Sequence, residues 1–378
     1  MRIGLNLLYL IPGVVGGTET YARGLISGLK QLELNHEYFI FMNRESAGVV
    51  QYDSPKFKSI ICPVSASNRK SRYYFEQVKL RHYLNKYKIH LLHSLGYVSP
   101  LFLQCPTVVT VPDLNIKAFG KQMQVIRRLV LELFIRQSVI RSNKIITISE
   151  FSRNEILNEY CVPFDKIVVT HLAVDRDDFK INHKTESMNT LVQFRINQPY
   201  ILAFSSAYYN KNISRLIEAF LEAKKNNKIK HKLILIGHSP HPIDNEKYAK
   251  LNLKNSDIIW TGYLNKQQVI DILKHADFLI FPSFYEGFGL PILEAMAVGI
   301  PVVCSKAASL PEVAGDAAVF FDPFSVKDIA VSIESVAINS PLRAKLKQKG
   351  FENLKRFSWK KSAAETVSVY EELLQGSK

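Results

Sequence analysis

The chain has 378 residues, of which 47% are hydrophobic and 22% charged, and a formal net charge of +15 at pH 7. This length exceeds what one core usually needs and predicts two domains. No signal peptide and no membrane-spanning apolar run is evident. The cysteines form no CxxC pair, which argues against structural zinc and a disulfide framework and predicts a reducing cytoplasm; they are Cys62, Cys105, Cys161 and Cys304.

Short apolar runs alternate with helix-length amphipathic stretches along the whole chain. "RIGLNLLYL", "TVVTVPD" and "KIITIS" belong to a first series, and "YILAFSSA", "KLILIGHS" and "DFLIFPS" to a second. Buried strands separated by helices indicate βαβ units and parallel sheets. We therefore predict an α/β protein with two doubly wound, Rossmann-like domains at residues 1–180 and 198–356, joined by the polar stretch 180–199 and followed by a terminal helix in 357–378.

The positive charge is concentrated in residues 68–88 and 117–144, where Lys and Arg alternate with apolar residues at helical spacing, as in "VIRRLVLELFIRQSVI". One interpretation is a pair of surface helices with solvated basic faces. The other is attraction to an anionic membrane surface or to a phosphate-bearing substrate. Nucleic acid is disfavoured as a partner, because no DNA- or RNA-binding motif accompanies the charge.

The stretch "FYEGFGLPILEAMAVGIPVV" places Glu286 and Glu294 on either side of a glycine-rich turn. "DFLIFPS" before it predicts a buried strand, Pro291 suits the first position of a helix, and Gly299 predicts its end. Residues 287–290 then form a strand-to-helix turn whose backbone amides can bind phosphate. Carboxylates repel phosphate but accept hydroxyl groups. A ligand in which phosphate lies between two hydroxyl-bearing rings is a nucleotide sugar.

Simpler interpretations exist for the same residues. Ser283 and Glu286 have the spacing of a helix capping box, and Glu294 could be a solvated helix residue. A glycosidase also uses two carboxylates but needs no phosphate site between them. A dinucleotide-dependent dehydrogenase is disfavoured, because GxGxxG does not follow a strand in a first βα turn.

The same stretch resembles the family-4 retaining glycosyltransferases, whose signature is written here as Glu286-GFGLPIL-Glu294. "PGVVGGTETYARGLISGL", "ITISEFSRNEIL", "VVTHLAVDRDDF", "NKNISRLIEAF" and "SLPEVAGDAAVFFDP" also resemble family segments, so the likeness covers nearly the whole chain. It implies a GT-B architecture, in which an acceptor-binding and a donor-binding domain face each other across a cleft. It also implies that the last helix crosses back to the first domain.

The resemblance implies a nucleotide-sugar site in the second domain. Glu294 would bind the ribose diol, Glu286 the transferred sugar, and Lys211 the diphosphate that leaves, so that Lys211 and Glu286 would act in catalysis. Tyr263 would lie beside the base. The backbone supporting the sugar and the diphosphate would belong to the turn residues Gly287, Phe288, Gly289 and Leu290.

The resemblance also implies roles for residues of the first domain. Gly16 and Gly17 would bring backbone amides to the donor phosphates or to the acceptor. Asp113, in "VTVPDL", would serve as the acceptor-side catalytic carboxylate. His93, in "LLHSLGYVSP", is a second candidate, although a lone histidine after an apolar strand is also typical of a structural residue.

The chain departs from the family pattern at three positions. Asn210 replaces the usual arginine before Lys211, Ser205 replaces a glycine, and Pro112 replaces the histidine before the acceptor-side aspartate. Asp175 and Asp177 spell DxD, a metal-binding pattern of a different glycosyltransferase fold, but they fall in the segment between the domains. We therefore expect neither a metal nor a cofactor.

The resemblance implies a retaining glycosyltransferase of cell-surface polysaccharide synthesis. The resemblance to bacterial O-antigen mannosyltransferases favours GDP-mannose as donor, with UDP-glucose and UDP-N-acetylhexosamines as alternatives. The expected acceptor is a glycan or a lipid-diphosphate-linked saccharide, reached from the cytoplasmic face of the membrane. A protein that binds a nucleotide sugar without catalysis is the alternative of a different class.

Overall fold

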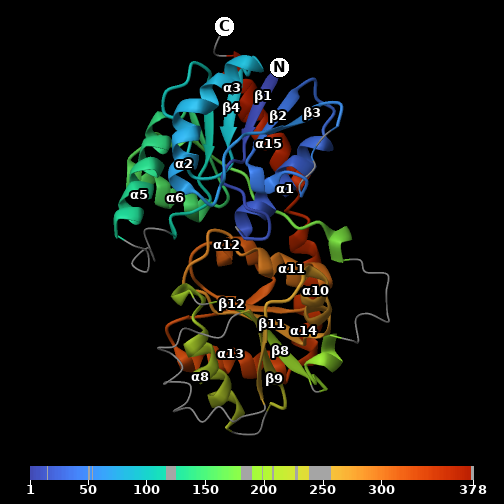
Figure 1. Cartoon of the computed structure of the whole chain (residues 1–378). Helices are drawn as coiled ribbons and strands as arrows, with labels where there is room; N and C mark the ends of the chain where they lie inside the picture. The colour runs from blue at the N-terminus through green and yellow to red at the C-terminus, as the bar shows by residue number, and fades with distance from the viewer. Residues whose placement is uncertain are drawn as a thin grey trace. The chain divides into compact units, whose positions relative to one another are not determined.

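The computed structural model describes residues 1–14, 16–49, 52, 54–115, 125–179, 190–197, 199–206, 208–225, 229–237 and 257–375. The chain divides into two compact units (Figure 1): unit 1 is Met1–Ala173 with Ser358–Lys378, and unit 2 is Val174–Phe357. Most of the predicted linker, residues 180–189 and 198, lies outside the described residues. The same holds for residues 117–124 of the second basic segment.

Unit 1 contains a seven-stranded parallel sheet in the order β3-β2-β1-β4-β5-β6-β7. This is a doubly wound order, in which the chain reverses direction across the sheet between β1 and β4. The strands are β1 (Arg2–Asn6), β2 (Glu37–Met42), β3 (Phe57–Ile61), β4 (Leu91–Ser94), β5 (Thr107–Thr110), β6 (Lys144–Thr147) and β7 (Ile167–Val169).

Helices lie on both faces of this sheet (Figure 1). A π-helical segment, Phe75–Lys79, joins α2 to α3. The helices of unit 1 are α1 (Gly17–Lys30), α2 (Arg69–Tyr74), α3 (Leu80–Lys86), α5 (Val125–Arg141), α6 (Glu150–Tyr160) and the C-terminal α15 (Trp359–Gln375).

Unit 2 contains a six-stranded parallel sheet in the order β10-β9-β8-β11-β12-β13, with its reversal between β8 and β11. The strands are β8 (Tyr200–Ser205), β9 (Lys232–Gly237), β10 (Ile258–Gly262), β11 (Phe278–Phe281), β12 (Val302–Ser305) and β13 (Ala318–Phe321). The helices are α8 (Ile213–Lys224), α10 (Lys266–His275), α11 (Leu290–Val298), α12 (Leu310–Ala314), α13 (Val326–Ala337) and α14 (Ser340–Leu354).

The local sequence explains these elements. β4, β11 and β12 are buried along their whole length, as expected for parallel strands covered on both faces. Several helices begin at a polar side chain that accepts a backbone N–H of the first turn, as Ser149 does for α6, Asn265 for α10 and Ser325 for α13. These caps satisfy donors that the helix itself leaves without partners.

The C-terminal helix packs on the first helix of the chain, within unit 1. A Cβ atom at Gly24 would lie 2.1 Å from the Trp359 ring, and one at Gly28 would lie 2.1 Å from the Trp359 carbonyl oxygen. These two positions of α1 therefore require glycine, because no larger residue allows α15 to approach so closely. The return of the last helix to the first domain, which the resemblance implied, is confirmed.

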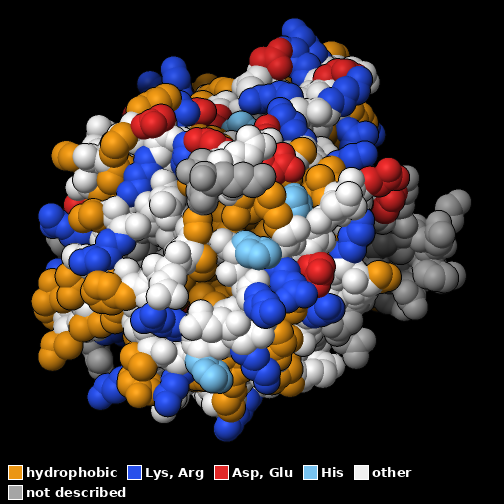
Figure 2. Space-filling view, turned by 90° about the horizontal axis from the view of Figure 1, so that it is seen from above, with side chains coloured by type: hydrophobic (Ala, Val, Ile, Leu, Met, Phe, Trp, Pro, Cys, Tyr) orange, Lys and Arg blue, Asp and Glu red, His pale blue; other side chains and the backbone are white. Residues whose placement is uncertain are grey.

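The surface of the protein is strongly basic. Figure 2 shows blue Lys and Arg side chains spread over the face seen from above, with fewer red carboxylates. Among the residues that the structure describes, no helix is both long and apolar enough to cross a bilayer. The four cysteines are free thiols.

Candidate functional site

An ion pair lies at the carboxyl edge of the unit 2 sheet. Lys211 ends a short 3-10 turn, Tyr209–Lys211, that follows β8, and Glu286 lies in the turn that follows β11. The Lys211 Nζ is 2.6 Å from Glu286 Oε1, and the two side chains are 22% and 17% exposed. The sheet reverses between β8 and β11, and such a reversal is where doubly wound proteins bind their ligands. The structure thus places two predicted site residues together at that point.

The glycine-rich turn after β11 is held from its inner side. The Ser309 hydroxyl donates to the carbonyl oxygens of Glu286 and Phe288, at 2.8 and 2.9 Å. Gly289 has φ of +104°, and a Cβ atom there would lie 2.7 Å from a methyl group of Leu310. Both the backbone conformation and the lack of space therefore require glycine at this position.

The helix that follows begins and ends as the sequence predicts. α11 carries Pro291 in its first turn, and Gly299 ends it with φ of +82°. In its first turn Pro291 has no N–H, and the Ile292 N–H donates to the Gly289 carbonyl at 3.0 Å. An anion at this helix end would therefore meet the Leu290 N–H and the positive end of the helix dipole. The capping-box interpretation of Ser283 and Glu286 is wrong, because the helix begins at Leu290 and not after Ser283.

Glu294 lies on α11 and is half-buried. Burial raises the pKa of its carboxyl group to about 7, although the charge of Lys266 acts in the opposite direction. A carboxyl group with this pKa exchanges its proton near neutrality. It can accept two hydroxyl groups of a ribose diol only when it is ionised.

Two asparagines that flank Lys211 support its loop. The Asn210 side chain donates to the Tyr285 carbonyl at 3.1 Å, and the Asn210 backbone carbonyl accepts the Phe284 N–H at 2.8 Å. The Asn212 amide donates to the carbonyls of Pro282 and Pro323, at 3.1 and 2.8 Å. Asn210 therefore ties the lysine loop to the glycine-rich turn where the family has an arginine.

Sequence reasoning did not single out Arg215, a nearby cation in the first turn of α8. Its guanidinium lies 5.3 Å from the Phe284 ring centre and 6.0 Å from that of Phe324, and these two rings stack at 4.8 Å. The sequence did contain a signal for Arg215, because an arginine four residues after Lys211 lies at the same end of the unit 2 sheet as that lysine. Tyr263, the candidate for the base, follows β10 and is 78% exposed.

The candidates of the first domain lie at the carboxyl ends of unit 1 strands. Gly16 and Gly17 begin α1, which follows β1. Asp113 follows β5 and accepts the Tyr97 hydroxyl at 2.8 Å and the Asn115 N–H at 3.1 Å. These contacts fix the orientation of the Asp113 carboxylate. These three residues lie in unit 1, whereas Lys211 and Glu286 lie in unit 2.

His93 is a structural residue. It is fully buried in β4, with Nδ1 2.6 Å from the Tyr370 hydroxyl and Nε2 2.7 Å from the Thr110 hydroxyl. Burial lowers the pKa of its imidazole to about 3. The neutral ring therefore joins α15 to the sheet, and it is not exposed to an acceptor.

The DxD pattern forms an exposed turn in unit 2. The Asp177 N–H donates to Asp175 Oδ1 at 3.0 Å, and the Arg176 guanidinium donates to the Phe351 carbonyl at 3.1 Å. Over the described parts of the chain, no group of three or more His, Cys, Asp or Glu side chains is arranged to hold a metal ion.

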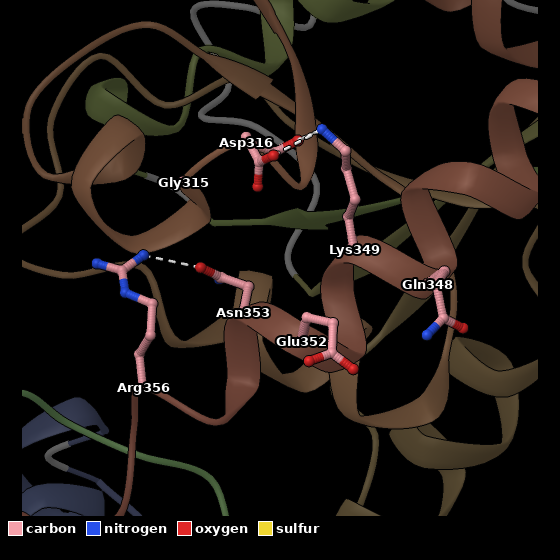
Figure 3. A pocket seen from close by; sticks show the side chains of 7 residues that line it. All are labelled: Gly315, Asp316, Gln348, Lys349, Glu352, Asn353 and Arg356. Atoms are coloured by element: carbon pink, nitrogen blue, oxygen red, sulfur yellow. Dashed lines mark hydrogen bonds and ion pairs between the residues drawn. The ribbon is translucent and has the colours of Figure 1, made fainter.

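A separate hollow in unit 2 contains none of the predicted site residues. Gly315 and Asp316 line it together with Gln348, Lys349, Glu352, Asn353 and Arg356 (Figure 3). Lys349 pairs with Asp316 at 2.6 Å, and Arg356 donates to Asn353 at 2.7 Å. These polar groups satisfy one another across an open surface, so the hollow offers no set of groups that points to a ligand.

Comparisons with known proteins agree with this arrangement. Residues 15–178 match the family described as Glycosyltransferase Family 4, and residues 191–353 match Glycosyl transferases group 1. The O-antigen chain mannosyltransferase B of Escherichia coli is 31% identical over 289 residues, which cover 76% of this chain and 75% of that protein.

Solved structures share the fold over the whole chain. The sucrose-phosphate synthase of Thermosynechococcus elongatus superposes with a TM-score of 0.76 at 17% identity, covering 100% of both chains. Anabaena HepE in complex with UDP-glucose gives a TM-score of 0.71 at 15% identity and covers 98% of this chain and 100% of its own. With two Rossmann-like domains and matches along both, this chain belongs to the family-4 glycosyltransferases of GT-B fold.

Proposed function

We propose that this glycosyltransferase moves a mannosyl residue from GDP-mannose to a glycan or a lipid-diphosphate-linked saccharide, with retention of the anomeric configuration. The name of the Escherichia coli relative supports mannose and a polysaccharide product. The UDP-glucose bound to HepE supports a nucleotide sugar and makes UDP-glucose the next donor to test. UDP-N-acetylhexosamines follow.

The ion pair of Lys211 with Glu286 is the observation that carries this proposal. It holds an ammonium group against the turn that leads from β11 into α11, at the reversal of the sheet. In our proposal, the diphosphate binds between this ammonium and the helix N-terminus. An ammonium that is already positioned can stabilise the negative charge of the departing diphosphate without reorganising, which is an efficient form of electrostatic catalysis.

The two glutamates have different tasks in this scheme. Glu286 is mostly buried and ionically paired, and it orients hydroxyl groups of the transferred sugar. Glu294, four residues after Leu290 on α11, accepts the two hydroxyl groups of the ribose. Tyr263 contacts the base, and the turn from Gly287 to Leu290 supports the sugar and the diphosphate.

The reaction is proposed as a displacement on one face of the sugar. A bond forms between the acceptor oxygen and the anomeric carbon while the bond from that carbon to the diphosphate oxygen breaks. The acceptor proton passes to the departing diphosphate oxygen. Asp113 orients the acceptor hydroxyl, and Gly16 and Gly17 provide backbone amides from unit 1. Lys211 and the α11 amides do what a metal ion does in other transferases, so the proposed reaction needs no metal.

Product analysis tests this function. The protein is incubated with GDP-mannose and a mannose-terminated acceptor, GDP release is followed by chromatography, and the new linkage is identified by NMR from its anomeric coupling. We expect release that depends on the acceptor and a product with the donor's anomeric configuration. An inverted product contradicts the retaining mechanism. Binding without turnover, over a panel of saccharide and lipid-linked acceptors, favours the non-catalytic alternative.

A further inference from the structure

Helix α5 of unit 1 exposes apolar side chains on the side opposite its buried face. Ile135, Ser138 and Val139 are buried, whereas Ile126 is 79% exposed and Leu133 is 57% exposed. Helical spacing places the exposed apolar residues on one stripe, which we call the α5 face: Val125, Ile126, Leu129, Val130, Leu133 and Ile140. A surface helix normally turns polar residues outward, so this face is suited to an apolar partner.

Arginines border the α5 face. Arg127, Arg136 and Arg141 are exposed, and Arg128 is half-buried in an ion pair with Glu132 at 3.5 Å. Glu132 is the single acidic residue of the helix sequence "VIRRLVLELFIRQSVIR". The helix therefore combines an apolar stripe with a clear excess of positive charge.

Helix α2, from the other basic segment, contacts α5. The Tyr73 ring of α2 stacks on Phe134 of α5 at 4.8 Å. Burial, and after it the charge of Arg127, lower the pKa of the Arg69 guanidinium. In Figure 2, orange side chains gather among blue ones at the left edge, the side on which Figure 1 shows α5. Helix α2 of the first basic segment thus packs against α5 of the second.

We propose that the α5 face docks on an anionic lipid bilayer. Its apolar side chains enter the boundary between headgroups and acyl chains, and its arginines bind lipid phosphates. This is how a basic amphipathic helix lies in a membrane interface. Guanidinium groups suit phosphate because they bind it through two parallel hydrogen bonds. Charge attraction alone would need no apolar stripe. Docking of the α5 face does not depend on which donor unit 2 binds.

Two triple variants separate the apolar and the charged contributions. Ile126→Gln, Leu129→Gln and Leu133→Gln remove apolar groups, and Arg127→Gln, Arg136→Gln and Arg141→Gln remove charge. The full chain is sedimented with vesicles of phosphatidylcholine containing phosphatidylglycerol, and with vesicles of phosphatidylcholine alone. We expect the arginine variant to lose about fivefold in affinity per residue at low salt, with the loss shrinking as salt rises.

The apolar variant should lose at least tenfold at every salt concentration, because burial of apolar surface is not screened. The matched control is Val192→Gln, Val331→Gln and Ile338→Gln, which changes three exposed apolar residues of unit 2 and should bind like the wild type. Circular dichroism and thermal unfolding verify the fold of all three. Equal binding of wild type and apolar variant overturns the proposal.

A second copy of the chain is the competing occupant. Sedimentation velocity without lipid distinguishes it: a concentration-dependent dimer that the apolar variant abolishes, together with no binding to either vesicle, contradicts membrane docking. We expect a wild-type protein whose sedimentation does not change with concentration and which binds the anionic vesicles.

Discussion

Replacing Glu294 with Gln should stabilise the protein at alkaline pH while weakening donor binding. Burial holds the pKa of this carboxyl group at about 7, against 4.5 for a free glutamate side chain. Glutamine is nearly isosteric and carries no charge, so the variant has no group to ionise at this half-buried position. The gain in stability and the loss in function thus have the same physical origin.

The sign and size follow from proton linkage. Because the folded pKa is raised, the folded protein binds more protons than the unfolded chain between the two pKa values, and stability falls as pH rises through that window. Below the lower value both states are protonated and the effect vanishes. With 1.36 kcal/mol per pKa unit, the free energy of unfolding should favour the variant by about 3 kcal/mol at pH 8 and about 1 kcal/mol at pH 5.

Urea unfolding of both proteins at pH 5, 6, 7 and 8 measures this difference. Glu352→Gln is the matched control, because that carboxylate is exposed on α14 and pairs with the exposed Lys355, and it should shift stability by well under 1 kcal/mol. A constant difference between wild type and Glu294→Gln at all four pH values would refute the reasoning. For the wild type, donor KM should fall as pH rises from 6 to 8, and this trend should be absent in the variant.

Three further results are expected. Lys211→Ala should lower kcat more than it raises donor KM, because charge on the departing diphosphate develops in the transition state; an unchanged kcat in steady-state assays contradicts the role of Lys211. Activity should survive excess EDTA, whereas loss that manganese or magnesium restores would favour a metal at Asp175 and Asp177. Gly28→Ala should destabilise the fold by about 2 kcal/mol or more in thermal unfolding, while the exposed neighbour Ser27→Ala should not.

The fold could be predicted from the sequence because its strands are buried on both faces. Runs such as "DFLIFPS" are nearly continuous in apolar residues, and each is followed by a helix-length segment. That pattern indicates parallel sheets without further information. Similarly, Pro291 and Gly299 indicate where α11 begins and ends. Proline has a fixed φ that suits the first turn of a helix, and glycine can adopt the positive φ that ends one.

The site could be predicted only in part, because its contacts join distant segments. The pairing of Lys211 with Glu286 depends on β8 lying beside β11, which local sequence does not determine. In the sequence, Asn210 marks a position where the family pattern has a cation and this chain has none. Its hydrogen bond to the Tyr285 carbonyl shows that it ties the lysine loop to the glycine-rich turn. The position of His93 is likewise decided by Tyr370, which lies 277 residues away.

The orientation of α5 could not be predicted for a different reason. Its sequence is apolar on two sides, so periodicity does not say which side meets the sheet. Burial of Ile135 and Val139 turns the other apolar side outward, among the arginines. The charge was visible in the sequence as a basic segment, but the exposed apolar stripe beside it was not.

The central claim is that unit 2 binds a nucleotide sugar between Lys211, Glu286 and the first turn of α11. A thermal-shift titration with GDP-mannose, UDP-glucose and UDP-N-acetylglucosamine tests it most directly, because a ligand that binds only the native state raises the melting temperature. The account predicts a saturable rise with one of these donors, GDP-mannose first, that is strongly reduced in Lys211→Ala and in Glu286→Gln and kept in Glu352→Gln. Equal rises in wild type and both site variants would contradict the claim.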